Sequence, residues 1–207
     1  MTISPPRFAL PGSWGRINLA SSATMQSSIR KVVEHAIGRD DRLATVRAEM
    51  RSRFLEAATV AREHDATDFH IALELAPGIP LPAWVSVFVP DIDATDFQAL
   101  GLTELKEALN FGLSSAQSDV AAAQTTVAQT RVHAVRQAFR TVQPETEEAP
   151  ELELLRADYW LAAADPNRLA LLSFTTGYVQ FETEMLELFD AVISTVRWPA
   201  PAPVPAQ

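Results

Sequence analysis

The spacing of hydrophobic residues near the start of the chain predicts a strand and then an amphipathic helix. Residues 13–19 alternate between apolar and polar side chains, which is typical of a short strand. Over residues 25–37 the apolar side chains recur every three or four positions, as they do on one face of a helix. Ser21 or Ser22 can cap the start of this helix, and Gly38 can end it.

The pattern next predicts a second helix, two strands and a third helix. Residues 43–61 keep the helical spacing of apolar side chains. The period changes to two over residues 68–75 and again over residues 83–89. Because a short loop rich in Pro and Gly joins these two segments, they predict a hairpin. Residues 96–113 return to a helical spacing.

Residues 119–142 have a pattern that fits two kinds of structure. The stretch "TTVAQTRV" has the composition of a strand, whereas Val132, Val135, Phe139 and Val142 are spaced as on a helix. The strands on either side of this region need partners in a sheet. We therefore favour strands for residues 119–142.

The end of the chain predicts a last hairpin and a closing helix. Residues 152–163 and 168–176 have strand character and flank "DPN", which is a turn sequence. Residues 181–196 then carry an apolar stripe at helical spacing, and the acids between these positions are expected to face solvent. The apolar positions of this stripe are Phe181, Met185, Leu188, Phe189, Val192, Ile193 and Val196.

Helices and strands are grouped along the chain and do not strictly alternate. This grouping predicts an α+β fold, in which an antiparallel β-sheet is flanked by helices. The length of 207 residues fits one domain, which we place at residues 1–198. Residues 199–207 are rich in Pro and Ala and predict an extended, flexible tail.

Charge and cysteine content exclude several classes of function. The formal net charge of −9 makes nucleic acid and anionic membranes poor partners, because both are negative. The chain contains no cysteine, so it has no disulfide, thiolate metal site or cysteine nucleophile. No apolar run approaches the roughly 18 residues of a membrane span, and the first residues do not resemble a secretory signal. We therefore expect a cytoplasmic protein without membrane insertion.

The stretch "HDATDFH" is the strongest candidate for a metal site. It places His64, Asp65, Asp68 and His70 within seven residues, and imidazole and carboxylate groups suit zinc or iron. The same residues also fit a helix end, a polar turn and the start of a strand. A turn alone does not make four ligands converge, so we predict no metal and no cofactor.

No pattern of catalytic residues stands out. His35 and His133 are isolated in the sequence, and no serine lies in a nucleophile elbow. Asp91 and Asp93 form a carboxylate pair in a polar, loop-like stretch, where solvated acids are the simpler interpretation. No glycine-rich phosphate loop occurs. We therefore predict no catalytic residue.

Five aromatic residues in the predicted strands are candidates for a pocket or groove. Such side chains can line a ligand cavity, but they also fill protein cores. Because nothing catalytic competes with it, we favour an exposed sheet face or groove that binds a protein partner. The five candidates are Trp84, Phe88, Tyr159, Trp160 and Phe174.

Short motifs at both ends of the chain resemble known proteins. "LPGSWGRINL", "PLPA" before a strand and the closing "LSFTT" and "LFDAVISTVRW" resemble an uncharacterised family of actinobacterial proteins of about this size. More distantly, the order of elements resembles the PsbP/Mog-type α/β/α sandwich, although the helical segment over residues 22–63 is longer than in that fold. The wider fold implies accessory subunits, regulators and chaperones, and it implies no shared catalytic residues.

These observations lead to one expected function and two alternatives. The leading expectation is a non-catalytic binding or accessory protein, adaptor-like or chaperone-like, that acts through a sheet face or groove. The first alternative is a carrier of a small molecule or lipid with an apolar pocket, and the second is an enzyme of unrecognised type.

Overall fold

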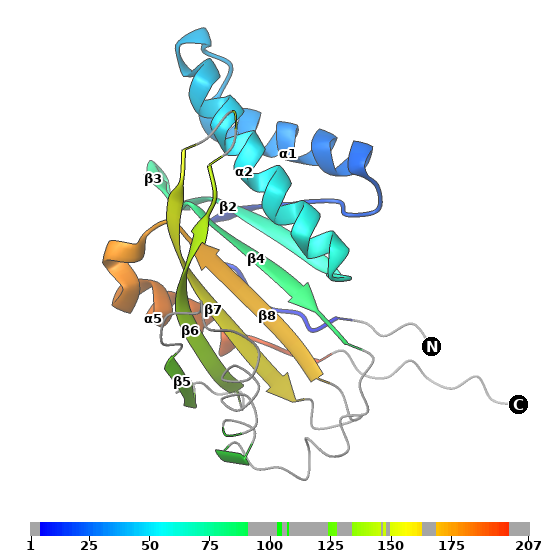
Figure 1. Ribbon diagram of the computed structural model, residues 1–207, viewed down its shortest axis with the longest axis vertical. Coiled ribbons are helices and arrows are strands. Elements are labelled where there is room, and N and C mark those ends of the chain that lie inside the picture. The colour runs from blue at the N-terminus through cyan, green and yellow to red at the C-terminus, as the bar shows by residue number, and fades with distance from the viewer. Residues whose placement is uncertain are drawn as a thin grey trace, which may run out of the picture.

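The protein has the predicted α+β architecture, with one antiparallel sheet and helices on both of its faces (Figure 1). The predicted helix over residues 96–113, apart from residues 103, 104 and 107, and the predicted tail over residues 199–207 lie outside the described part of the chain. The computed structural model describes residues 5–90, 103–104, 107, 124–127, 134–145, 147, 150–162 and 169–198.

The described strands follow the order β1-β2-β4-β8-β7-β6-β5 across the sheet, and the short β3 pairs with the end of β2 on the same side as β4. All neighbouring strands are antiparallel. Strand β5 and all of β6 except Gln143 fall within residues 119–142, so the strand prediction for that region is confirmed where it is described. The strands are β1 (Ser13–Arg16), β2 (Asp68–Ala76), β3 (Ile79–Pro80), β4 (Ala83–Phe88), β5 (Gln124–Val127), β6 (Ala134–Gln143), β7 (Leu152–Ala162) and β8 (Leu169–Thr176).

Three α-helices and two short 3₁₀ turns complete the described fold. The Ser21 side chain caps α1 by accepting a hydrogen bond from the backbone N–H of Thr24, and Gly38 ends the helix with a positive φ of 77°. Both caps were predicted. None of the described helices is long and apolar enough to cross a membrane. The helical elements are α1 (Ser22–Ile37), η1 (Asp41–Leu43), α2 (Ala44–Glu63), η2 (Val179–Phe181) and α5 (Glu182–Ile193).

One face of the sheet packs against α5, which lies behind the sheet in Figure 1. Its core contains Tyr159, Phe174 and Phe189, all fully or almost fully buried. The ring of Phe174 lies edge-on to Tyr159 and stacks on Phe189, with centroids 5.7 and 4.6 Å apart. Phe181 does not belong to this stripe, because it precedes the first turn of α5 and is 49% exposed. The predicted stripe is therefore wrong at its first position.

On the other face, the described helices cover only part of the sheet. Helices α1 and α2 pack over β1, β2 and β4, where Phe69 and Ile71 of β2 meet Phe54 of α2. Phe54 also lies edge-on to Trp84 of β4, at 6.3 Å between centroids. Beyond Trp84, no described helix covers β8, β7 and β6 on this face (Figure 1). This region contains a groove that the described residues line.

Candidate groove on the open face of the sheet

The groove lies between α2 and the β6–β7 hairpin, and its floor is the sheet. Its volume is about 1070 Å³. Half-buried side chains of Trp84, Phe88 and Trp160 line the floor, together with Leu171. One wall is α2, which presents Ala57, Val60, Ala61 and His64 at helical spacing, and the other is the hairpin around Gln143.

The strand register arranges the floor in three rows that run across β4, β8, β7 and β6. The middle row is polar and consists of Ser86, Ser173, Asp158 and Gln137, which are paired neighbours in the sheet. Aromatic rings flank it on both sides, because strand residues two positions apart share a face. The outer rows are Trp84, Thr175, Arg156 and Phe139, and Phe88, Leu171, Trp160 and Val135.

Polar contacts fix the orientation of several floor side chains. The indole N–H of Trp160 donates to Oε1 of Gln137 at 3.1 Å. Arg156 donates from Nε to Oδ1 of Asp158 at 2.9 Å, and its guanidinium lies 5.4 Å from the ring centroid of Phe139. The two charges of this ion pair offset each other, so the floor as a whole carries little net charge.

Several hydrogen-bonding groups of the floor have no partner. The hydroxyl groups of Ser86, Ser173 and Thr175 make no hydrogen bond within the described part of the chain, and all three residues line the groove. The amide nitrogen Nε2 of Gln137 is buried and has no acceptor there either. An unpaired buried donor is costly, but Gln137 is not among the described residues that line the groove.

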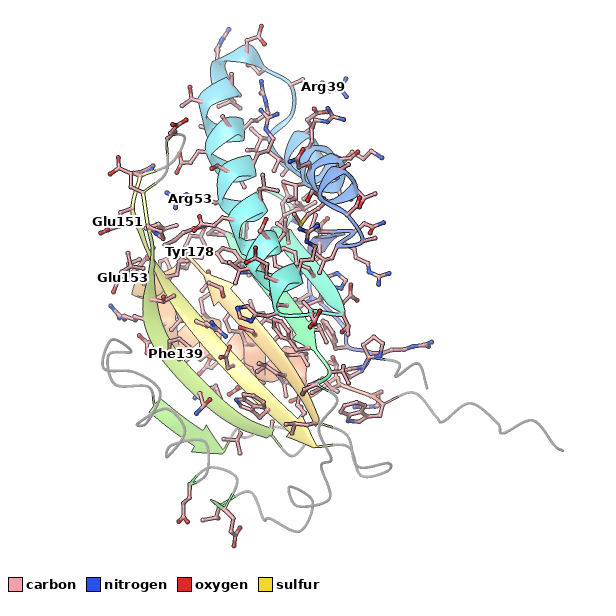
Figure 2. The ribbon with its side chains drawn as sticks, turned by 45° about the vertical axis from the view of Figure 1, so that its right-hand side comes forward. Arg39, Arg53, Phe139, Glu151, Glu153 and Tyr178 are labelled. Carbon is pink, nitrogen blue, oxygen red and sulfur yellow. The ribbon has the colours of Figure 1, made fainter. Side chains whose placement is uncertain are left out.

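A cluster of hydrogen bonds holds the hairpin wall against α2. Arg53 of α2 donates from Nη2 to the carbonyl of Pro150 at 2.7 Å and lies beside the hairpin in Figure 2. Nη1 of Arg53 donates to Oε1 of Gln143 at 3.4 Å, and Nε2 of Gln143 donates to Glu56 at 2.6 Å. These contacts tie together the two walls at one end of the groove and set their separation.

The five aromatic candidates divide between the two faces of the sheet. Trp84, Phe88 and Trp160 line the groove. Tyr159 and Phe174 do not reach it, because they point to the opposite face and are buried against α5. Neighbouring residues of one strand, such as Tyr159 and Trp160, point to opposite faces, so the five side chains cannot share one cavity.

Tyr159 instead helps to hold α5 on the sheet. Its hydroxyl donates to Oδ1 of Asp190 at 2.6 Å, and Nη1 of Arg136 contacts the other oxygen of that carboxylate at 2.8 Å. Burial, followed by the hydrogen bond to Asp190, raises the pKa of Tyr159 well above its ordinary value. The prediction that the acids of this helix face solvent is wrong for Asp190, because Arg136 and Tyr159 lie directly beneath it.

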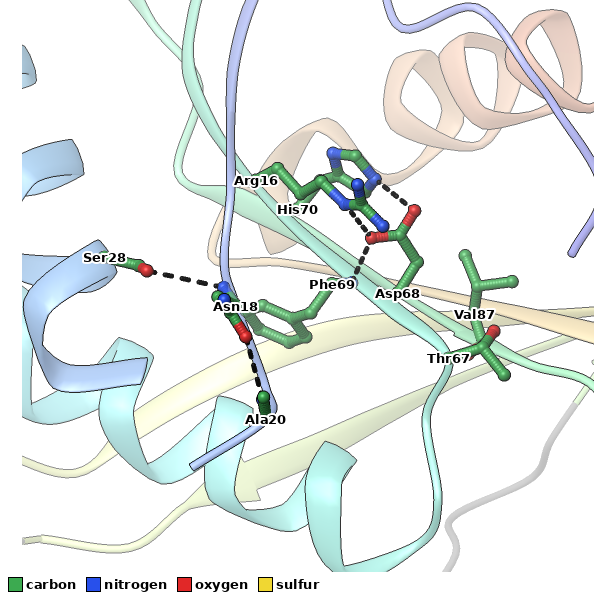
Figure 3. Close-up of polar contacts among 9 residues, drawn as sticks. All are labelled: Arg16, Asn18, Ala20, Ser28, Thr67, Asp68, Phe69, His70 and Val87. Carbon is green, nitrogen blue, oxygen red and sulfur yellow. Dashed lines mark hydrogen bonds and ion pairs between the residues drawn. The ribbon is translucent and has the colours of Figure 1, made fainter. Parts of the chain in front are cut away.

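The residues of "HDATDFH" separate into two places. His64 and Asp65 lie at the end of α2, where they line the groove. Asp68 and His70 lie on β2, where Oδ2 of Asp68 is 3.1 Å from Nε2 of His70 and Oδ1 accepts from Nε of Arg16 at 2.6 Å (Figure 3). Within the described residues, no three acidic or histidine side chains are grouped as metal ligands would be.

Asp68 is nevertheless in an unusual electrostatic setting. Partial burial opposes its charged form, but hydrogen bonds and attraction from His70 and Arg16 outweigh that effect and lower its pKa.

The remaining candidate residues are not brought together in the described part of the chain. His35 lies on an exposed part of α1. Asp91, Asp93 and His133 lie outside the described residues.

The polar middle row was not found from the sequence. Ser86, Ser173, Asp158 and Gln137 lie on four strands and are far apart in the chain, so only the register brings them together. The available signal was the alternation of polar and aromatic residues in "WVSVF" and "RADYW", which places one polar residue between two larger ones.

Comparisons of this chain with protein-family models, with curated proteins and with solved structures found no match.

Proposed function

We propose that the protein is a non-catalytic binding protein that receives an apolar segment of a partner protein in the groove between α2 and the β6–β7 hairpin. The observation that carries this proposal is the set of half-buried aromatic rings on the floor, Trp84, Phe88 and Trp160. Large apolar side chains that remain accessible together commonly mark a binding surface. Aromatic residues are also enriched among the residues that dominate binding energy.

The walls support the same proposal. Val60 of α2 is 49% exposed and lies at the groove between Ala57 and His64. Polar residues also lie on the walls, with Glu56 and Asp65 on one side and Gln143 on the other. Protein interfaces commonly combine aromatic residues with polar groups that form hydrogen bonds, as this groove does. The resemblance to the PsbP/Mog-type fold, which implies accessory roles, remains a prediction in agreement with this function.

A carrier of a small apolar molecule is the second candidate. The groove volume of about 1070 Å³ is near the upper end for ligand pockets, and the hydroxyl groups of Ser86, Ser173 and Thr175 could orient a ligand. Native mass spectrometry of the purified protein distinguishes the two functions. A retained molecule of a few hundred daltons, absent after denaturation, would favour the carrier.

A pair of variants on one helix tests the partner hypothesis. Val60→Lys places a charge at the groove, whereas Val46→Lys places it elsewhere on α2, where Val46 is 43% exposed. We expect proteins captured from an extract by the tagged wild-type chain to be retained by Val46→Lys and lost from Val60→Lys. Because both valines are exposed, neither variant should unfold, and thermal unfolding checks this. Equal capture by both variants would contradict a role for the groove.

A further inference from the structure

The α2 wall of the groove carries two carboxylates that make no ion pair within the described residues. Glu56 and Asp65 both line the groove, and neither makes an ion pair within the described part of the chain. The one hydrogen bond to the Glu56 side chain comes from the neutral amide of Gln143. Among the described residues that line the groove, Arg156 is the only arginine, and its charge is offset by Asp158. The charge left over among them is negative and lies on α2 and just beyond its last residue.

These two carboxylates lie at opposite ends of the wall. Glu56 and Asp65 are nine residues apart, and Val60 lies between them. Asp65 lies two residues beyond Glu63, the last residue of α2, and has a positive φ of 59°, so it is just past the end of the helix. A partner that fits this wall places positive groups at both ends and apolar groups between them.

The floor supplies a second requirement. The hydroxyl groups of Ser86, Ser173 and Thr175 line the groove and make no hydrogen bond within the described residues. A peptide backbone has a carbonyl and an N–H at nearly every residue, so it can satisfy such a row at several points. An alkyl chain has neither group.

We propose that the occupant of the groove is a basic amphipathic peptide segment. Its apolar side chains contact Trp84, Phe88 and Trp160, and its lysine or arginine side chains pair with Glu56 and Asp65. Its backbone carbonyls face the polar middle row of the floor. This inference rests on the proposed function, because it names the chemistry of the partner that the groove receives.

Three synthetic peptides of 14 residues provide the probe. All carry leucine at the same positions, spaced for one face of a helix, and their remaining positions are lysine, glutamine or glutamate. Binding is measured by fluorescence anisotropy of the labelled peptides at low and physiological salt. We expect the lysine peptide to bind at least tenfold more tightly than the glutamine peptide, and the glutamate peptide most weakly. Added salt should weaken the lysine peptide most.

A matched pair of double variants distinguishes binding of the peptide at the groove from general electrostatic attraction between a basic peptide and an acidic protein. The test variant is Glu56→Gln with Asp65→Asn; asparagine tolerates the positive φ of 59° at position 65. The control is Glu63→Gln with Glu151→Gln, two exposed acids outside the groove lining that remove the same charge. We expect about tenfold weaker binding of the lysine peptide to the test variant and less than a twofold change for the control.

The outcomes distinguish this inference from the proposed function. If the lysine and glutamine peptides bind with equal affinity and only Val60→Lys weakens their binding, the groove binds apolar segments regardless of their charge. In that case the inference fails and the proposed function stands. If the two double variants weaken binding equally, or the lysine peptide does not bind, the inference is also overturned. If Val60→Lys changes the binding of none of the peptides, the proposed function loses its support as well.

Discussion

The two faces of the sheet are built from the same strands but differ in how they are covered. On the α5 face, Tyr159 and Phe174 are shielded from water and pack around Phe189. On the groove face, Trp84 and Trp160 keep part of their rings accessible. Tyr159 and Trp160 are adjacent residues of β7, and they point to opposite faces of the sheet. One belongs to the α5 core, and the other lines the groove.

The difference shows that two cores can hold the fold while the described helices cover only part of one face. Helix α5 closes one core, and the α1–α2 pair closes a second over β1, β2 and β4. Over β8, β7 and β6 the groove face carries no described helix, and contacts at its edge, such as those of Arg53, connect it to α2. Stability and binding are therefore expected to depend on different residues.

The largest expected effect is on the closed face. Phe189→Ala removes a ring that is 1% exposed and stacked on Phe174. Loss of a fully packed aromatic side chain leaves a cavity and costs about 3–5 kcal/mol in the free energy of unfolding. Urea unfolding followed by far-ultraviolet circular dichroism measures this loss.

The matching variant on the open face is Phe88→Ala. The ring of Phe88 is half-buried at the groove, so we expect its removal to cost less than half as much as that of Phe189. Equal losses for the two variants would mean that the groove face is as much a structural core as the α5 face, and the comparison would fail.

Much of this division could be predicted from the sequence. The 3.6-residue period over residues 25–37 and 43–61 and the alternation over residues 68–75 and 83–89 depend only on neighbouring positions. The alternation in "AWVSVFV" also separated Trp84, Ser86 and Phe88 from the valines, and the structure places Val85 and Val87 in the α5 core. Local patterns therefore predicted where the elements lie and which residues of a strand share a face.

What could not be predicted depends on contacts between distant parts of the chain. Asp190 has the spacing of a solvated helix residue, and only the packing of α5 places it over Tyr159 and Arg136. The order β4-β8-β7 likewise brings Trp84 and Trp160 to one face while Phe174 lies on the other. Composition identified aromatic residues in strands, but the strand order decides which of them form a groove.

The next largest effect concerns the hydrogen bond between Tyr159 and Asp190. Tyr159→Phe keeps the ring but leaves one oxygen of a half-buried carboxylate without its donor. A hydrogen bond to a charged group contributes about 1.5–3 kcal/mol, and we expect a loss in this range. Asp190 keeps its contact with Arg136, so the variant should remain folded, and urea unfolding at neutral pH measures the change.

The pKa of Tyr159 adds a pH dependence to this prediction. Its folded-state pKa is raised, so above about pH 10 the unfolded chain loses the hydroxyl proton while the folded chain keeps it. The unfolded state then binds fewer protons, and stability falls as pH rises. Tyr159→Phe should reduce the alkaline loss measured between pH 9 and pH 11. An identical loss in both proteins would show that Tyr159 is not its cause.

The smallest expected effect is on the groove side of the same strand. Trp160→Phe keeps an aromatic ring on the floor but removes the indole N–H that donates to Gln137. The loss leaves a buried amide with neither of its groups paired within the described residues. A neutral hydrogen bond contributes about 1 kcal/mol, so this cost should be smaller than that of Tyr159→Phe.

Trp14→Phe is the control for this change. Its indole N–H also makes one hydrogen bond, to the carbonyl of Pro11 at 2.7 Å, but Pro11 is only partly buried. Water can replace the lost donor at the carbonyl of Pro11 more easily than at Oε1 of Gln137, a residue that is 3% exposed, so Trp160→Phe should cost more than Trp14→Phe in the free energy of unfolding. Equal losses of stability in the two variants would show that water reaches Gln137 as easily as it reaches Pro11. The polar middle row would then be an ordinary hydrated surface, and the comparison with the closed α5 face would be contradicted.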